Sequence, residues 1–112
     1  MAVDKIEKAK AYLLKDCIDY SSGATVSKIM TKNSNGNTTL FAFDQGQNLS
    51  EHTAPFDAIV LVIDGKCKVT IDGVEHHLSE GEVIIMPANI PHALEATEAF
   101  KMLLTMIKYQ QN

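Results

Sequence analysis

The chain of 112 residues contains no arginine, so all ten of its basic residues are lysines. Arginine grips phosphate and carboxylate groups through two parallel hydrogen bonds, and lysine cannot replace it in that role. The net charge of -4 gives no attraction to a phosphate backbone, and no basic cluster is longer than Lys-x-Lys. The sequence therefore argues against bidentate capture of a nucleotide-sugar or phosphate ligand, and it predicts no nucleic-acid partner.

Cysteine and long apolar runs are also scarce. Cys17 and Cys67 are too few for a disulfide framework, and neither belongs to a Cys-x-x-Cys pair. Cys67 alternates with Val69 and Ile71, which predicts a small buried hydrophobic side chain. No apolar run approaches the roughly 20 residues that span a membrane, and the first residues, MAVDKIEKAK, lack the apolar core of a signal peptide. We therefore expect no membrane partner and a cytoplasmic location.

Length and composition predict one globular domain. Hydrophobic residues make up 46% of the chain and charged residues 21%, which is typical of a folded protein with one ordinary core. We expect residues 1–24 to form an N-terminal helix or arm and residues 25–109 to form the domain. The last residues, Gln110 to Asn112, are expected to be a frayed end.

A helix is predicted over residues 4–16, with an extended arm as the alternative for the stretch LLKDCIDY. Asp4 and Glu7 match a capping pattern in which each side chain satisfies a free amide of the first turn. Apolar residues then follow at spacings of three, four and four, which is one helix face: Ile6, Ala9, Leu13 and Cys17.

From residue 25 onward the apolar period is two, which indicates strands. Thr25–Lys32 and Asn37–Asp44 are predicted strands, separated by a turn in which Asn35-Gly36 supplies positive φ angles. Further turn signals follow at short intervals, at Gly46, Asp64-Gly65, Asp72-Gly73 and Glu80-Gly81. This spacing is typical of an all-β sandwich or barrel rather than of alternating βα units.

Several predicted strands are apolar on both faces. Ala58–Ile63 and Val83–Met86 show no polar face, and the last strand carries apolar residues on both sides. One face of these strands can line the interior. The other needs a second sheet, the N-terminal segment or another copy of the chain, and we expect a homodimer.

Two histidines stand out among the four. His52 lies shortly before Pro55, and His92 directly follows Pro91, so both are expected at strand edges around the mouth of a barrel. His76 and His77 are adjacent and must point to opposite faces of a strand, which favours a polar hairpin strand without a site. Two histidines in matching contexts favour one shared site for His52 and His92.

The stretch from Gly46 to Gly65 resembles the first motif of the cupin superfamily, G-x5-H-x-H-x3,4-E-x6-G. Gly46, His52 and Gly65 match that motif at the right spacing. The family's second histidine falls on Ala54 and its glutamate falls on Ala58.

The stretch from Gly81 to Ala96 resembles the second cupin motif, G-x5-P-x-G-x2-H-x3-N. Gly81, Pro87 and His92 match, while Asn89 replaces the glycine and Ala96 replaces the asparagine. The resemblance implies a small single-domain cupin with a degenerate metal motif. Its fold would be all-β, an antiparallel double-stranded β-helix or jelly-roll barrel with a short N-terminal helix or arm.

In metal-binding cupins, two histidines and a glutamate of the first motif and one histidine of the second hold the ion. Only His52 and His92 remain here as predicted ligands, with Asp57 as a candidate third ligand. Asp57 is one residue from the glutamate position, which turns its side chain to the other face unless a bulge near Pro55 reverses it. Two imidazoles and water hold a divalent ion such as zinc, nickel, copper, manganese or iron only weakly.

The alanines at the lost ligand positions predict a roomier, more apolar cavity, lined by Ala54, Ala58, Val60 and Met86. The first hypothesis is therefore a cupin that binds a small organic molecule or sugar in the barrel without strong metal dependence. The alternative is a metal-dependent enzyme, a dioxygenase or isomerase, using His52 and His92. A third reading is a structural barrel whose outer surface binds a partner, and the sequence leaves open whether the protein is an enzyme.

Overall fold

The computed structural model describes residues 2–108, so the predicted domain end at residue 109 and the predicted frayed end lie outside the described residues. The regular structure of these described residues consists of nine strands and one 3-10 turn: η1 (Leu14–Asp16), β1 (Thr25–Asn33), β2 (Gly36–Phe43), β3 (Asn48–His52), β4 (Phe56–Asp64), β5 (Lys66–Ile71), β6 (Val74–Ser79), β7 (Val83–Met86), β8 (His92–Glu95) and β9 (Phe100–Lys108). Within residues 2–108, no helix has the length and apolar character needed to cross a membrane.

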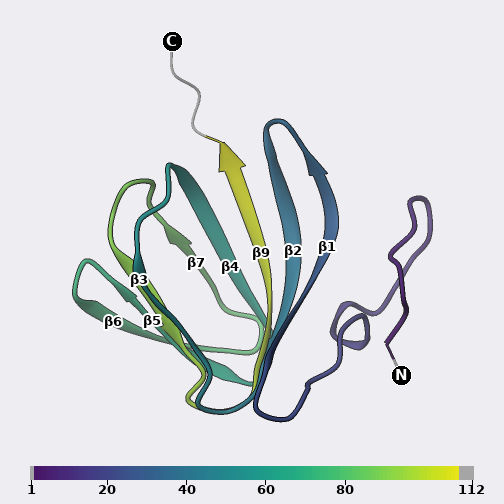
Figure 1. Ribbon diagram of the computed structural model, residues 1–112, viewed down its shortest axis with the longest axis horizontal. Helices are drawn as coiled ribbons and strands as arrows, with labels where there is room; N and C mark the ends of the chain where they lie inside the picture. The colour runs from purple at the N-terminus through teal and green to yellow at the C-terminus, as the bar shows by residue number, and fades with distance from the viewer. Residues whose placement is uncertain (1, 109–112) are drawn as a thin grey trace.

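The strands form two antiparallel sheets, ordered β1-β2-β9-β4-β7 and β3-β8-β5-β6. Non-consecutive strands are neighbours in both sheets, as in a jelly roll. The sheets converge towards the start of β9 and spread apart towards its end (Figure 1). The prediction of an all-β, antiparallel jelly-roll barrel is confirmed, and the strand limits at β1 and β2 fall within one residue of those predicted.

The core lies between the sheets and follows the period of two. In β4, Ala58, Val60 and Val62 are buried inside while their neighbours face outward. At the converging end, the rings of Phe43 and Phe100 stack with centroids 4.7 Å apart and planes within 8°. This alternation explains why β4 is apolar on both faces: the inner face fills the barrel, and the outer face lies on the outside of the five-stranded sheet.

The prediction of a helix over residues 4–16 is wrong. The segment forms an arm, which was the alternative. Only Leu14–Asp16 make a single 3-10 turn, and Ala9 has a φ of 60°, which a right-handed helix excludes. The expected cap does not form, because the amide of Glu7 donates instead to the hydroxyl of Tyr12 (3.1 Å). The spacing of a few apolar residues indicated a helix, but packing against the sheet stabilises a non-helical path instead.

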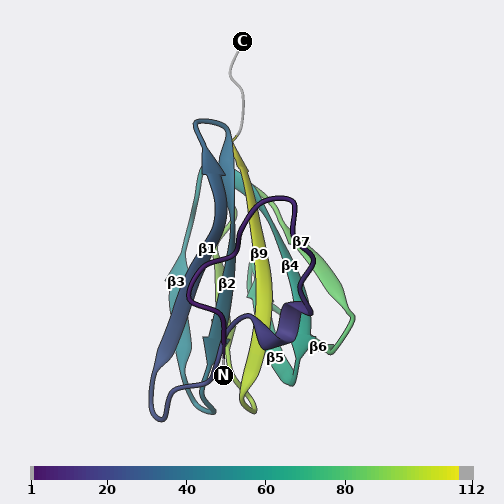
Figure 2. The same ribbon diagram turned by 90° about the vertical axis from the view of Figure 1, so that its right-hand side faces the viewer.

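The arm crosses the outer face of the five-stranded sheet (Figure 2). Cys17 and Ile18 are buried there against Leu40 and Ala42 of β2. Further apolar side chains of the arm and the sheet pack around them: Val3, Ile6, Tyr12, Leu14, Val26, Met30, Ile63 and Leu103. The arm therefore covers part of the outer apolar surface that the sequence leaves without a partner.

Two lysines of the sheet hold the arm by its backbone. The ammonium group of Lys28 donates to the carbonyl oxygens of Val3 and Cys17. Lys101, which is almost fully buried, donates to the carbonyl oxygen of Lys15 (2.6 Å).

Two short connections set strand spacing. The β1–β2 turn is made by Ser34 and Asn35, so Gly36 begins β2 rather than forming the turn as predicted. Gly65, between β4 and β5, has a φ of 74°, and a Cβ there would lie 2.0 Å from the carbonyl oxygen of Ala99. Only glycine fits this close approach between the β4–β5 connection and the start of β9.

Candidate functional site

His52 and His92 lie opposite each other in the four-stranded sheet, where β3 ends and β8 begins. They are register partners, and the shift between Leu49 and His52 adjusts the end of β3 to that pairing. The two Nε2 atoms are 3.2 Å apart, and the ring centroids are 4.4 Å apart at an angle of 68°. Histidines forty residues apart in the sequence thus share one position, as their matching contexts predicted.

Each ring is oriented by the carbonyl group of the residue two positions earlier in the chain. His52 Nδ1 donates to the carbonyl oxygen of Ser50 (2.7 Å), and His92 Nδ1 donates to that of Ile90 (3.1 Å). A carbonyl oxygen can only accept, so each Nδ1 carries a proton. In the neutral rings the proton is therefore absent from both Nε2 atoms, which lie 3.2 Å apart.

The two histidines differ in their access to solvent. His92 is 3% exposed, whereas His52 is exposed at the mouth of the barrel. Burial lowers the pKa of His92 below its ordinary value of 6.5, the hydrogen bond to Ile90 opposes this, and the neighbouring His52 lowers the pKa further. Burial therefore favours the neutral form of His92, in which Nε2 carries a lone pair.

A hollow of about 50 Å³ lies inside the barrel next to the histidine pair. It is lined by Leu49, His52, Ala54, Ala58, Met86, His92, Leu94, Met102, Leu104 and Met106. Of the four residues predicted to line the pocket, Ala54, Ala58 and Met86 do so. Val60 does not, because it is fully buried in the core beside the hollow.

The wall opposite the histidines belongs to the five-stranded sheet and carries methionines. Ala58 pairs with Met86 of β7 on one side and with Met106 of β9 on the other, so the three form one row across the sheet. Met102 lines the same hollow deeper in the barrel. Sequence reasoning missed Met102 and Met106 as lining residues, although their shared face of the last strand was the signal that could have found them.

Asp57 does not join the histidines. It precedes the inward-facing Ala58, and its carboxylate accepts a hydrogen bond from the amide of Ala88 (2.9 Å). Asp57 therefore braces the loop between β7 and β8, as a polar residue at a strand start. Within residues 2–108, no three side chains of the histidine, cysteine, aspartate or glutamate type are grouped closely enough to hold a metal ion.

Asn89 replaces the glycine of the second motif without changing the backbone. Its φ of 63° lies in the left-handed region that glycine favours and that asparagine tolerates better than most residues. The backbone N–H of Asn89 donates to the carbonyl oxygen of Ala54 (2.8 Å), which connects the loop before His92 to the segment after His52. The loop thus keeps the shape that brings the two histidines together.

The other candidates lie away from the hollow. Glu51 is exposed, and His77 is exposed near Glu75, with 3.9 Å between His77 Nε2 and Glu75 Oε1. His76 is partly buried opposite Val69 in the edge strand β6. Cys67 is buried, as predicted, and burial raises the pKa of its thiol to about 11.

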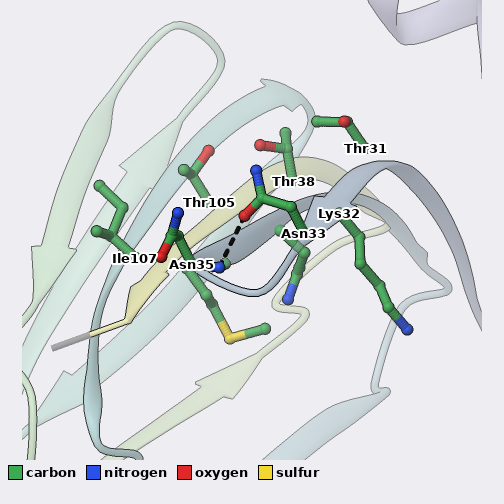
Figure 3. Close-up of a pocket in the computed structure, with 10 residues that line it drawn as sticks. Thr31, Lys32, Asn33, Asn35, Thr38, Thr105 and Ile107 are labelled. Carbon is green, nitrogen blue, oxygen red and sulfur yellow. Dashed lines mark hydrogen bonds between the residues drawn. The ribbon is translucent and has the colours of Figure 1, made fainter. Parts of the chain in front are cut away.

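Larger depressions lie outside the barrel. One of about 230 Å³ is at the tip of the β1–β2 hairpin, and the side chains labelled there are mostly hydroxyls and amides, with Asn33 Oδ1 accepting from the amide of Asn35 (Figure 3). Another, of about 340 Å³, lies between the arm and the hairpin and is lined in part by Ile6, Tyr12 and Met30. Neither contains a histidine, so the barrel hollow remains the candidate site.

The chain belongs to the cupin family: the model of the cupin domain matches residues 39–108. That range includes both histidines and eight of the nine strands in whole or in part. No curated protein is similar enough to the chain to match it.

Solved structures agree with this assignment. A conserved protein of unknown function from Streptococcus pyogenes is 35% identical, with a TM-score of 0.90 over 99% of this chain and 97% of that one. A cupin 2 conserved barrel domain protein from Leptotrichia buccalis is 43% identical with a TM-score of 0.84, covering 87% of this chain and 47% of that one. A cupin superfamily protein from Desulfitobacterium hafniense is 22% identical, with a TM-score of 0.88 over 97% of this chain and 100% of that one.

Proposed function

We propose that this cupin binds one transition-metal ion between His52 and His92. The separation of the two Nε2 atoms, 3.2 Å, carries the proposal. Two nitrogens bound to one tetrahedral ion at about 2.0–2.1 Å lie about 3.3 Å apart, so the separation of the two Nε2 atoms matches that of two ligands on one ion.

The orientation of the rings supports the same function. Two unprotonated nitrogens at this separation repel, and a cation bound by both removes that repulsion. Each Nδ1–H donates to a backbone carbonyl oxygen, which is how metal-bound histidines are usually held. When bound, such an ion would polarise an oxygen ligand or lower the pKa of a bound water. The proposal assigns binding and no reaction.

The experiment is elemental analysis of the purified, untagged protein after incubation with transition-metal ions, under reducing conditions for copper, and removal of the excess. We expect about one ion per chain in the wild type and loss of that ion in the double variant His52→Ala/His92→Ala. The matched control is His76→Ala/His77→Ala, which removes two histidines outside the hollow and should retain the ion. Equal metal content in all three proteins would contradict the proposal.

A second candidate, binding of a small organic molecule, is favoured by the apolar walls of the hollow. Its volume of about 50 Å³ admits only a few water-sized groups. Pockets for sugars and other drug-sized ligands are roughly 300–1,000 Å³. A ligand of this kind must therefore be very small. Saturable binding of such a compound by metal-free protein, retained in His52→Ala/His92→Ala, would favour it over the metal.

We also propose that a second copy of the chain covers the outer face of β4, β7 and β9. Val83 and Ile85 are 59% and 57% exposed there, and Ile107 is 54% exposed. Leu61 and Ile59 lie between them, as register partners of Val83 and Ile85. The arm leaves this apolar surface uncovered, and two-fold association is the commonest way to bury such a surface.

Sedimentation velocity at micromolar concentration tests the dimer. We expect the wild type to sediment as a dimer and Ile85→Asp as a monomer. Val74→Asp is the matched control, because Val74 is equally exposed, at 58%, but belongs to β6 of the other sheet. A monomeric wild type would defeat the proposal.

A further inference from the structure

The methionine row Met86–Ala58–Met106 faces the histidine pair across the barrel hollow. We infer that the ion this hollow prefers is monovalent copper, Cu(I), held by the two imidazoles and by the thioether sulfurs of Met86 and Met106. The inference rests on the proposed function and names the metal for the same site.

The geometry brings four soft or borderline donors to one small space. His52 and His92 come from β3 and β8 of one sheet, whereas the methionines come from β7 and β9 of the other. All four side chains line the same hollow of about 50 Å³, which has room for one ion and little else. Ala58 separates the methionines and has too small a side chain to fill the space between them.

The four proposed ligands carry no charge, and this favours a metal ion of lower charge. Among residues 2–108, no side chain with a carboxylate or thiol lines the hollow. The free energy required to move an ion from water into an apolar interior rises with the square of its charge, so an uncompensated divalent ion is disfavoured about four times as strongly as a monovalent one. A hollow without an anionic ligand is therefore better suited to Cu(I) than to a divalent cation.

Ligand softness favours the same ion. Thioether sulfurs select Cu(I), whereas carboxylate oxygens suit harder divalent ions. Ala58 occupies the position at which the first cupin motif has its glutamate, and it is flanked by the two methionines. This wall of the barrel therefore offers sulfur where the motif would offer a carboxylate oxygen.

The test compares two metals on the metal-free full-length chain, Cu(I) under anaerobic reducing conditions and Zn²⁺, each in competition with a chromophoric chelator. The test variant is Met86→Leu/Met106→Leu, which keeps side-chain volume and removes both sulfurs. The control is Met30→Leu, whose methionine packs under the arm on the outside of the sheet. X-ray absorption of the copper-loaded protein reads the ligand shell directly.

We expect Cu(I) to be held with a sulfur shell beside the nitrogen shell. The double methionine variant should lose about tenfold or more in Cu(I) affinity with little change for Zn²⁺, and Met30→Leu should match the wild type. Zn²⁺ binding without Cu(I) binding, or a copper shell without sulfur, would overturn the inference and leave the proposed function standing. Failure to bind either metal would overturn both.

Discussion

The two ends of the barrel interior share strand β9 but are filled differently. Where the sheets converge, Phe43 and Phe100 stack at 4.7 Å and both are fully buried. Where the sheets spread apart, the side chains at the equivalent inward positions surround a hollow of about 50 Å³. β9 takes part in both ends, with Phe100 at one and Met106 at the other.

This difference indicates which part of the interior serves stability. A hollow leaves the side chains around it without packing partners on one side, so the hollow end contributes less to stability than the filled end. The chain fills the converging end and leaves the other end open beside two imidazoles. The following predictions treat the first end as structural and the second as a site.

The largest effect is expected at the filled end. Phe100→Ala removes one ring of the stacked pair and should lower the free energy of unfolding by about 3–5 kcal/mol. Met86→Leu at the hollow end nearly conserves volume and should lower it by less than about 1.5 kcal/mol. Denaturant unfolding of both variants measures this, and equal losses would remove the distinction between the two ends.

Filling the hollow should act in the opposite direction. Ala58→Val places two methyl groups between Met86 and Met106, and we expect a gain in unfolding free energy of about 0.5–2 kcal/mol together with weaker metal binding. Thermal unfolding of the metal-free variant and metal content after loading are the measurements. A variant that is more stable and binds metal as well as the wild type would show that the ion does not use the hollow.

A pH dependence of stability should come from the hollow end. The pKa of His92 is lower in the folded chain than its ordinary value of 6.5, chiefly because the ring is buried. The unfolded chain therefore takes up the proton first, so the contribution of His92 is present above pH 6.5 and is lost as the pH falls through the lower folded pKa. One such group changes the unfolding free energy by at most about 1.4 kcal/mol per pH unit.

The measurement is the free energy of unfolding of the metal-free protein between pH 7.5 and 5. This range surrounds the pKa of a histidine in the unfolded chain, about 6.5. We expect His92→Gln to flatten the curve and His77→Asn, which changes an exposed ring, to leave it unchanged. A free energy of unfolding that rises in the wild type as the pH falls would contradict this prediction.

The smallest effect is expected in the loop beneath the histidines. Asn89→Gly restores the residue type that best tolerates a φ of 63°, and we expect a change in unfolding free energy of only a few tenths of a kcal/mol. Asn89→Val, whose branched side chain opposes that conformation, should destabilise by about 1–2 kcal/mol. Equal melting temperatures for the two variants would indicate that the left-handed bend is unimportant.

Local patterns were sufficient to predict the strands and the pairing of His52 with His92. Alternating residues and turn glycines are short-range signals, and the two motifs carry the histidines at spacings that the barrel requires. The arm could not be predicted in the same way. Apolar residues spaced by three and four fit a helix, but the outer face of β1 and β2 offered them more contact in an irregular path.

The sequence predicted Met86 as a lining residue, but for a different reason it could not show that Met106 lies on the other side of Ala58. Met86 and Met106 meet around Ala58 only because three strands from distant parts of the chain take one particular register. Register depends on the whole sheet, and the volume of the hollow depends on every side chain around it. The protonation of both imidazoles at Nδ1 likewise depends on the carbonyl groups of Ser50 and Ile90, which the spacing of the histidines does not reveal.

The lysines that fasten the arm have a consequence for how that segment can change. Lys28 and Lys101 grip main-chain oxygens, and every amino acid supplies an identical oxygen. Substitution of the exposed Lys15 can therefore proceed without releasing the arm. Loss of the charge on Lys28 or Lys101, in contrast, would weaken these hydrogen bonds and loosen the arm from the sheet.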